Sequence, residues 1–160
     1  MINESEIALF HTKITDLDSF YTFQLDKEGD FMAAFTSSAM AEKPAFINKY
    51  ARLLNEPTVH MRTIACNGLI VGSISKFEIE GKAEITYWID RSFWNKGISS
   101  AALKSFLALE KKRPLSARVA FDNYGSQRVL EKSGFVKIGT DKGFANARQR
   151  EIEEFIYRLD

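Results

Sequence analysis

Two short turns divide the middle of the chain into strands and fix how those strands can pair. Apolar residues recur there at every second position, which is the period of a strand with one buried face. Asn67-Gly68 interrupts this pattern, and Asn-Gly is the strongest short hairpin signal because both turn positions need a positive φ. A second turn at Gly81 leads into the next strand. The sequence therefore predicts an antiparallel meander of three strands, at residues 61–66, 69–75 and 84–89.

Helical spacing of apolar residues appears on both sides of this meander. Upstream, a strand at 7–10 precedes a helix that Thr15 can cap, and Pro44 suits the first turn of a second helix that ends before Pro57. Between these helices, residues 26–39 mix glycine and hydroxyl side chains with phenylalanines, and we expect an irregular segment. Downstream we predict helices at 98–109 and 125–133, and strands at 115–121, 135–138 and 152–159, the last two joined by a polar loop containing Lys142, Gly143, Arg148 and Arg150.

The predicted order of elements is β-α-α-β-β-β-α-β-α-β-β. No repeat and no shift in composition divides the 160 residues, so we expect a single domain over residues 1–160. This order belongs to the α+β class, with a mixed sheet that carries helices on its faces.

Charge and cysteine content exclude several classes of function. Lysine and arginine total 22 against 21 acidic residues, whereas a nucleic-acid-binding protein is expected to be strongly basic. Cys66 is the only cysteine and no Cys/His cluster has metal-ligand spacing, so we expect neither an intramolecular disulfide nor a metal site. The polar N-terminus lacks a secretory signal and no apolar run approaches membrane-spanning length, which favours a cytoplasmic protein with no membrane partner.

Residues Trp94 to Ser100 lie between a predicted strand and a predicted helix, where backbone N–H groups and the helix dipole can receive a phosphate. Gly97 permits close approach by that phosphate, Lys96 adds a positive charge, and Ser99 adds a hydroxyl beside that of Ser100. On its own this pattern has a plainer explanation, because Gly followed by Ser at a helix start is ordinary N-capping. A phosphate site is therefore favoured only if residues further along the chain support it.

A second motif stands about one strand later. Residues 123–126 (Asn-Tyr-Gly-Ser) open a short predicted helix, which ends in residues 131–135 (Glu-Lys-Ser-Gly-Phe). This motif resembles the second conserved motif of the GNAT acetyltransferases, and residues 94–100 stand where that family has Gln/Arg-x-x-Gly-x-Gly/Ala. Residues 83–90 followed by Phe-Trp at 93–94 are most similar to the RimJ/RimL type, the ribosomal-protein-alanine N-acetyltransferases. The resemblance implies a mostly antiparallel central sheet with helices on both faces and a splay between its central strands.

Some positions depart from the family pattern. Trp94 replaces Gln or Arg, as it commonly does in RimJ/RimL-like members, while Asn95 and Ser99 stand where small residues are usual. Leu130 occupies the position at which several members have a tyrosine that protonates the leaving thiolate. The resemblance therefore supplies no general acid.

The resemblance implies direct transfer of acetyl from acetyl-CoA, the co-substrate, to an amine within a ternary complex, without a metal. The strand edge at Trp88, Ile89 and Asp90 would then hydrogen-bond the pantetheine through backbone groups. Asn123 would contact the same pantetheine arm. The pyrophosphate would be held by Lys96, Gly97, Ile98, Ser99 and Ser100.

Three side chains are candidates for the chemistry. Glu84 is the candidate general base, because a carboxylate on this strand near the splay can accept the amine proton directly or through a water. The alternative is that Glu84 faces solvent or pairs with a lysine. Ser126 or Tyr124 could stabilise the leaving thiolate, although Ser126 is equally suited to hydrogen bonding at a helix start and Tyr124 to packing at the surface.

These observations predict an acetyl-CoA-dependent N-acetyltransferase that acts on a primary amine, either of a small molecule or, by the RimJ/RimL resemblance, of a protein N-terminus. A different class of function is a GNAT-fold module that binds coenzyme A or a related ligand without turnover, which Leu130, Asn95 and Ser99 motivate. An unrelated α+β interaction protein would require the two ordered motifs to arise by chance. Either a monomer or a homodimer is compatible with the sequence.

Overall fold

The computed structural model describes residues 2–36 and 42–160, which form a seven-stranded sheet in the order β1-β2-β3-β4-β5-β7-β6. Neighbouring strands are antiparallel except β4 and β5, which are parallel. The strands are β1 (Ile7–His11), β2 (His60–Cys66), β3 (Leu69–Ile79), β4 (Lys82–Ile89), β5 (Leu115–Ala120), β6 (Val136–Ala145) and β7 (Arg150–Leu159). The helices are α1 (Leu17–Gln24), α2 (Lys27–Ala33), α3 (Lys43–Leu54), α4 (Ile98–Leu109) and α5 (Tyr124–Lys132). This mixed, mostly antiparallel sheet confirms the predicted α+β class.

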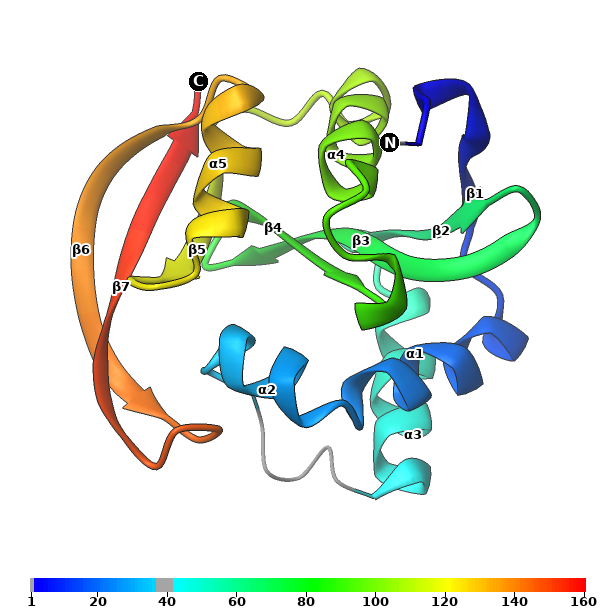
Figure 1. The fold of residues 1–160 in the computed structure, drawn as a ribbon, viewed down its shortest axis with the longest axis horizontal. Helices are drawn as coiled ribbons and strands as arrows, with labels where there is room; N and C mark the ends of the chain where they lie inside the picture. The colour runs from blue at the N-terminus through cyan, green and yellow to red at the C-terminus, as the bar shows by residue number, and fades with distance from the viewer. Residues whose placement is uncertain (1, 37–41) are drawn as a thin grey trace.

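Helices cover both faces of the sheet (Figure 1). Helices α4 and α5 lie on one face, over the largest group of buried apolar side chains, which includes Leu103 and Leu130. Helices α1 and α3 pack on the opposite face through a second cluster that contains Leu17 and Phe46. Helix α2 lies on this second side as well, near the end of β5. None of the helices in the described ranges is long and apolar enough to cross a membrane.

The turns that defined the predicted meander are confirmed. Asn67 and Gly68 adopt φ values of 49° and 85°, the positive values that a two-residue hairpin turn requires at both positions. Glu80 and Gly81 repeat this geometry, with φ values of 53° and 76°, between β3 and β4. These two turns place β2, β3 and β4 side by side in chain order.

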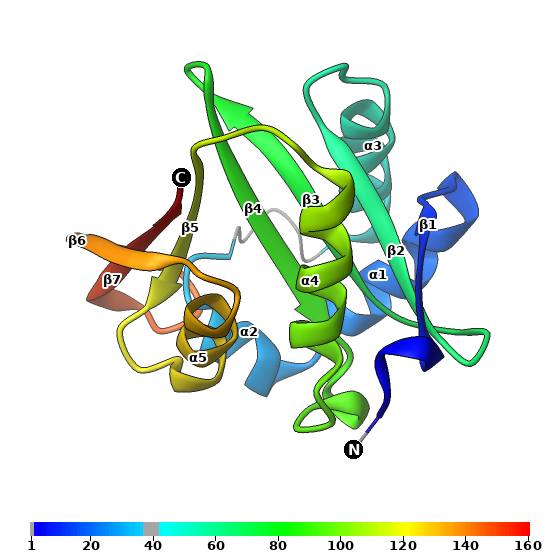
Figure 2. The same ribbon diagram turned by 90° about the horizontal axis from the view of Figure 1, so that it is seen from above.

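Strands β4 and β5 separate along their length. Their parallel pairing consists of Ala83 with Leu115 and Glu84 with Ser116, after which the two strands diverge (Figure 2). Beyond this point β5 remains paired with β7, and β4 remains paired with β3 as far as Ile89. The predicted splay is therefore present, and it opens toward the loop that leads into α4.

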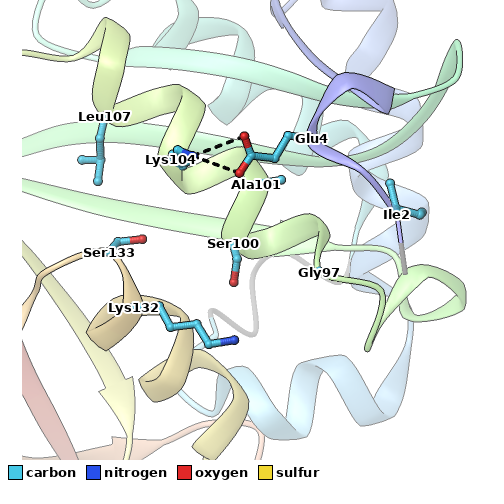
Figure 3. A pocket seen from close by; sticks show the side chains of 9 residues that line it. All are labelled: Ile2, Glu4, Gly97, Ser100, Ala101, Lys104, Leu107, Lys132 and Ser133. Carbon is cyan, nitrogen blue, oxygen red and sulfur yellow. Dashed lines mark hydrogen bonds and ion pairs between the residues drawn. The ribbon is translucent and has the colours of Figure 1, made fainter.

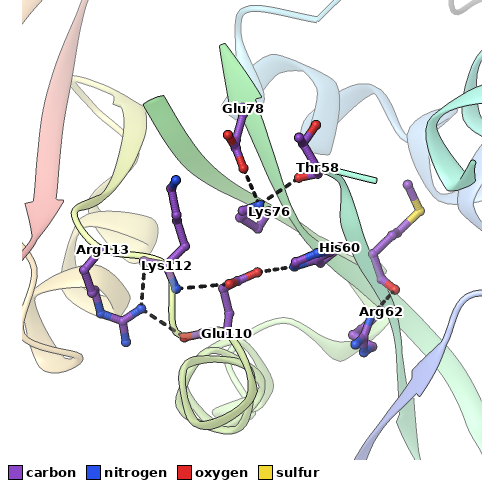
Figure 4. A network of polar contacts seen from close by, with 9 residues as sticks. Thr58, His60, Arg62, Lys76, Glu78, Glu110, Lys112 and Arg113 are labelled. Carbon is purple, nitrogen blue, oxygen red and sulfur yellow. Dashed lines mark hydrogen bonds and ion pairs between the residues drawn. The ribbon is translucent and has the colours of Figure 1, made fainter. Parts of the chain in front are cut away.

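A polar network fixes the C-terminal end of α4 against β2 (Figure 4). His60 Nδ1 lies 2.5 Å from Glu110 Oε1, and the backbone N–H of Lys112 donates to Glu110 Oε2 at 3.1 Å. Beside this pair, the buried Lys76 ammonium donates to the Thr58 carbonyl at 2.8 Å and to Glu78 at 2.7 Å. These contacts hold the C-terminal end of α4 against β2.

The segment between α1 and α3 differs from the sequence prediction. Within residues 26–39, which we predicted to be irregular, residues 27–33 form α2, and Asp26 caps this helix by accepting the Gly29 N–H at 3.0 Å. Residues 37–39 of this range lie outside the described part of the chain. Thr15 is not a helix cap, because it lies inside a 3₁₀ turn that precedes α1. Asp26 is an N-cap residue and could have indicated the start of α2. The glycine and the hydroxyl residues that follow it favoured an irregular segment instead.

The polar loop predicted near the C-terminus is shorter than expected. Lys142 and Gly143 belong to β6 and Arg150 belongs to β7, so that of the four loop residues only Arg148 lies in the connecting turn. Strand β6 lies at the edge of the sheet and exposes residues on both faces, so its sequence lacks the alternation that marks a strand with one buried face. This explains why the prediction ended β6 too early.

Candidate active site

The backbone of β4 presents alternate residues to the gap between β4 and β5. The Asp90 N–H donates to the Val71 carbonyl at 2.8 Å, and the Trp88 carbonyl oxygen lies against Gly72, so both residues direct backbone groups toward β3. The backbone N–H and C=O groups of Tyr87 and Ile89 therefore face the gap. This differs from the prediction, which placed Trp88, Ile89 and Asp90 together on the open edge.

The carbonyl of Ile89 already has a partner. The indole Nε1–H of Trp94 donates to it at 2.9 Å, which folds the loop after β4 back onto the end of the strand. The sequence analysis placed Trp94 at the start of the candidate phosphate segment and among the RimJ/RimL-like residues, but predicted no contact for its side chain. In the structure its indole ties the loop that precedes α4 to the last residue of β4.

The start of α4 carries the N–H groups of the buried Ile98 and of the half-buried Ser99 and Ser100. Gly97, at the N-cap, adopts a φ of 81°, and no side chain of the described residues caps the helix. The first N–H groups of a helix have no partner within the helix, so those of Ile98, Ser99 and Ser100 are available to an anion. Lys96 precedes this turn and is exposed, while its carbonyl accepts the Ile2 N–H at 3.1 Å.

A cavity of about 530 Å³ runs from this helix start along α4 to the end of α5 (Figure 3). Gly97 and Ser100 line one side, and the Lys132 side chain extends toward them from α5. Lys104, on the same wall, is paired with Glu4 at 3.1 Å. No ion pair involves Lys132 within residues 2–36 and 42–160, so its charge is available to a ligand. Lys132 stands in the second motif, but no pattern in the sequence assigned it a site role.

Glu84 lies at the point where β4 and β5 begin to separate. Its side chain is 16% exposed, and its Oε1 lies 3.8 Å from Arg118 Nε. Burial raises the pKa of Glu84 above its ordinary value, the Arg118 charge opposes this, and the Glu154 charge adds to it. Glu84 therefore neither faces solvent nor pairs with a lysine, the two alternatives that the sequence left open. Its carboxylate is mostly buried and lies beside an arginine.

Arg118 is shared among several acids. Its Nη1 donates to Glu154 at 2.8 Å and to Asp141 at 3.2 Å, both shorter than its contact with Glu84. The guanidinium is thus engaged mainly by the outer strands. Glu84 has only a long ion-pair contact with Arg118, which leaves its carboxylate oxygens able to accept a proton.

Asn123 and Ser126 meet at the start of α5. Asn123 Oδ1 accepts the Ser126 N–H at 3.3 Å as the helix cap, and its Nδ2 lies 3.5 Å from the Met32 carbonyl. Tyr124 is 62% exposed, and Leu130 is fully buried in the core. The structure thus gives Asn123 a structural role at the end of β5, beside the one that the resemblance implies.

Tyr87 is a candidate site residue that the sequence analysis did not single out. Its hydroxyl lies 2.8 Å from Ser126 Oγ, so that a hydrogen bond joins β4 to α5 across the gap. Burial raises the pKa of Tyr87 to about 12, although the hydrogen bond with Ser126 acts in the opposite direction. The pattern of alternation could have placed this side chain on the α5 side of the sheet, but not its distance from Ser126.

Helix α2 is fastened beside the gap by two arginines. Arg91, in the loop after β4, pairs with Asp26 at 3.3 Å and with Glu28. Arg148, from the β6–β7 turn, donates to both Asp122 oxygens at 2.6 and 2.8 Å, donates to the Phe31 carbonyl at 2.9 Å, and lies over the Phe31 ring. Three distant segments therefore form one wall on the Glu84 side of the sheet.

A sheet that splays beside a glycine-led helix start defines a class of acyl-transfer proteins, and the family comparison agrees. Residues 7–136 match the acetyltransferase (GNAT) domain, so the chain belongs to the GNAT acetyltransferase family. The uncharacterized N-acetyltransferase p20 of Bacillus licheniformis is 31% identical over 84 residues, which is 49% of this chain and 47% of p20. The aligned part thus spans about half the length of that curated relative.

Solved structures share the whole fold at low sequence identity. RimL, a ribosomal alpha-N-protein acetyltransferase in complex with coenzyme A, superposes with a TM-score of 0.79 at 19% identity, over 97% of this chain and 94% of RimL. The microcin C7 self immunity acetyltransferase MccE, in complex with acetyl-CoA and AMP, gives 0.79 at 17% identity, over 96% and 92% of the two chains. RimJ of Mycobacterium smegmatis, in complex with a coenzyme A disulfide, gives 0.76 at 17% identity, over 96% and 81%. At these identities the likeness establishes the fold.

Proposed function

We propose that this chain is an acetyl-CoA-dependent N-acetyltransferase, formed by a single domain, that transfers acetyl directly to a primary amine. The observation that carries the proposal is the gap between β4 and β5, which opens beside the uncapped start of α4. Membership of the GNAT family and the ligands named for RimL and MccE support coenzyme A as the molecule that enters this gap.

The residues present fit coenzyme A. Its phosphates require anion partners. The N–H groups of residues 98–100 and the exposed Lys96 provide them at the start of α4, and Lys132 adds a charge at the cavity that Gly97 and Ser100 line. The pantetheine arm requires amide partners, and the backbone of Tyr87 and Ile89 faces the gap. Asn123 stands at the opposite side of this gap, at the end of β5.

Glu84 and Ser126 supply the two chemical roles that amide formation needs. The amine nitrogen attacks the thioester carbonyl carbon, a C–N bond forms and the C–S bond breaks with its electron pair on sulfur. Glu84 accepts the proton that the nitrogen loses, directly or through a water. Ser126 donates a hydrogen bond to the sulfur. Tyr124 is a weaker candidate for this second role, because its side chain is largely exposed.

The acceptor is an amine that reaches Glu84 from the side where α2 and the β6–β7 turn lie. A protein N-terminal amine is supported by the RimJ/RimL-like residues of β4 and by the fold shared with RimL and RimJ. A small-molecule amine is the competing acceptor. Peptides with free and with blocked N-termini, tested beside small primary amines, distinguish the two.

A non-catalytic module that binds coenzyme A is the second candidate function. Leu130, which is buried and carries no hydroxyl, favours it, because several family members have a tyrosine at this position. Release of free thiol from acetyl-CoA in the presence of an amine, lost in Glu84→Gln, would support the enzyme. Tight binding without any thiol release over a broad amine panel would support the module.

Calorimetric titration of acetyl-CoA tests the binding site itself. We expect binding to the wild type and at least tenfold weaker binding to Gly97→Trp, because the indole would occupy the space in front of the α4 N–H groups. Gly81→Trp is the matched control, since Gly81 also has a positive φ but lies at a remote turn with open space around it. A wild type that folds but binds no coenzyme A species would refute the proposal.

A further inference from the structure

The hydroxyl groups of Tyr87 and Ser126 form a pair whose members come from opposite sides of the gap. Tyr87 belongs to β4 and Ser126 to the first turn of α5, and their oxygens are 2.8 Å apart. The Tyr87 ring packs against the core under α4 and α5, which holds its hydroxyl in place. The pair therefore lies beside the path that the proposed function assigns to the thioester.

The direction of this hydrogen bond can be inferred from the distances. Tyr87 Oη lies 2.8 Å from Ser126 Oγ but 3.5 Å from the Ser126 carbonyl, and the longer distance is at the outer limit of a hydrogen bond. Among residues 2–36 and 42–160, Tyr87 therefore has a good acceptor only if it donates to Ser126 Oγ. In that arrangement the Ser126 proton is free to point at another acceptor. Because burial raises the pKa of Tyr87 to about 12, this phenol keeps its proton at physiological pH.

We propose that Tyr87 is a positioning residue, which orients the Ser126 hydroxyl toward the sulfur of the leaving coenzyme A thiolate. This inference rests on the proposed acetyltransferase function. In this proposal, a residue of β4 helps to stabilise the leaving thiolate. Leu130 on α5 cannot do so, because it has no hydroxyl. Both hydroxyls keep their own protons: the C–S electron pair stays on sulfur, which later takes a proton from water, while the proton lost by nitrogen passes to Glu84 or to water. Hydrogen bonds to a developing negative charge are among the stronger contributions to catalysis.

The acidity of bound coenzyme A tests this role without turnover. Ultraviolet absorbance of the thiolate gives the pKa of the bound thiol, which we expect to lie below that of free coenzyme A in the wild type. In Tyr87→Phe this bound pKa should rise by about one unit, which corresponds to a tenfold loss of thiolate stabilisation. Ser126→Ala should raise it at least as much.

Tyr157→Phe is the matched control. Tyr157 is a second buried tyrosine that joins the sheet to α5, through a 3.1 Å hydrogen bond to Glu131, but it comes from β7, away from the gap. Removing its hydroxyl should leave the pKa of the bound thiol unchanged. If Tyr157→Phe shifts that pKa as much as Tyr87→Phe does, the effect is a general loosening of α5 and the proposal is wrong.

Steady-state kinetics give the second measurement. We expect kcat to fall about tenfold in Tyr87→Phe and about 100-fold in Ser126→Ala, with little change in KM for acetyl-CoA. The double variant should be no slower than Ser126→Ala, because Tyr87 acts only through Ser126. Effects that multiply in the double variant would overturn the positioning role.

A variant that keeps both the ring and the hydroxyl guards against misfolding. If Tyr87→Phe does not fold, 3,5-difluorotyrosine placed at position 87 retains the hydroxyl but makes it a stronger donor, so the pKa of the bound thiol should fall further; no change would refute the inference. The proposed function fails separately, and takes this inference with it, if the wild type neither binds coenzyme A nor releases thiol. A wild type that does both while Tyr87→Phe behaves identically refutes the positioning role alone.

Discussion

Glu84 is held between opposing influences that can be separated by single substitutions. Burial and the Glu154 charge raise its pKa, whereas Arg118 lowers it. A general base has to be ionised to accept a proton, so each of these influences should appear in the pH dependence of the reaction. Substitutions of Glu84 and of its charged neighbours therefore test the proposed catalytic role most directly.

The acid limb of the pH profile should report Glu84. We expect kcat/KM to fall as the pH drops through a pKa above the ordinary 4.5, because protonated Glu84 cannot accept the amine proton. Glu84→Gln should remove about 100-fold or more of kcat/KM. The measurement is kcat/KM against pH with an amine whose own ionisation is corrected for.

Arg118→Met tests how the Arg118 charge affects the pKa of Glu84. Loss of the positive charge that lowers the pKa of Glu84 should raise that pKa further, so the acid limb should begin at a higher pH. Arg158→Met removes an exposed arginine of β7, which pairs with Asp160, and should leave the limb in place. An acid limb at the same pH in Arg118→Met would mean that another group is the base.

Helix α2 joins the proposed acceptor side to the loop before α4. Asp26 caps this helix and also pairs with Arg91, which follows β4. The orientation of α2 therefore depends on the same loop that positions Gly97. A change in α2 should act on the acceptor more than on coenzyme A, because α2 lies on the opposite side of the sheet from α4.

Asp26→Ala tests this separation. We expect the free energy of unfolding to fall by about 1 kcal/mol from loss of the cap, and KM for the amine to rise severalfold more than KM for acetyl-CoA. Asp26→Asn retains an oxygen that can cap the helix but loses the ion pair with Arg91. Urea unfolding and the two KM values distinguish these contributions, and equal changes in both KM values would contradict the assignment of α2 to the acceptor side.

Features that depend on neighbouring residues could be predicted from the sequence, whereas features that depend on distant segments could not. Asn67-Gly68 and Gly81 fixed the order of β2, β3 and β4, because a turn acts on its immediate neighbours. Helix α2 and most of β6 were missed, because an N-cap among turn formers and an edge strand without a buried face leave no periodic pattern. Tyr87 and Lys132 were missed because they join the candidate site only through the fold. Tyr87 meets Ser126, which is distant in sequence, and Lys132 lines a cavity together with Gly97 and Ser100.

At the scale of the whole molecule, the sheet is continuous at one end of the β4–β5 boundary and open at the other. A ligand that fills the opening adds contacts between two parts that share few backbone hydrogen bonds. Coenzyme A binding should therefore be visible in the stability of the entire fold.

Thermal unfolding and hydrogen exchange measure this effect together. Coenzyme A at 100 times its Kd should stabilise the native state by about 2.7 kcal/mol and raise Tm by roughly 5–10 °C. The backbone amides of Tyr87 and Ile89, which face the gap, should exchange more slowly in the complex. Protection confined to His11, His60 and their neighbours, which line a separate cavity, would place the ligand elsewhere.

The division of the sheet also coincides with a division of the chain. Strands β1 to β4 come from residues before α4, and β5, β7 and β6 come from residues after it, so each part of the sheet is built from one continuous stretch. The hairpin contacts of β2, β3 and β4 are local in sequence, whereas the β4–β5 contact has to wait for α4 to form the crossover. During synthesis from the N-terminus, the meander can form first, and β5, β6 and β7 are added after α4, so the opening between β4 and β5 lies where the two successive steps of folding meet.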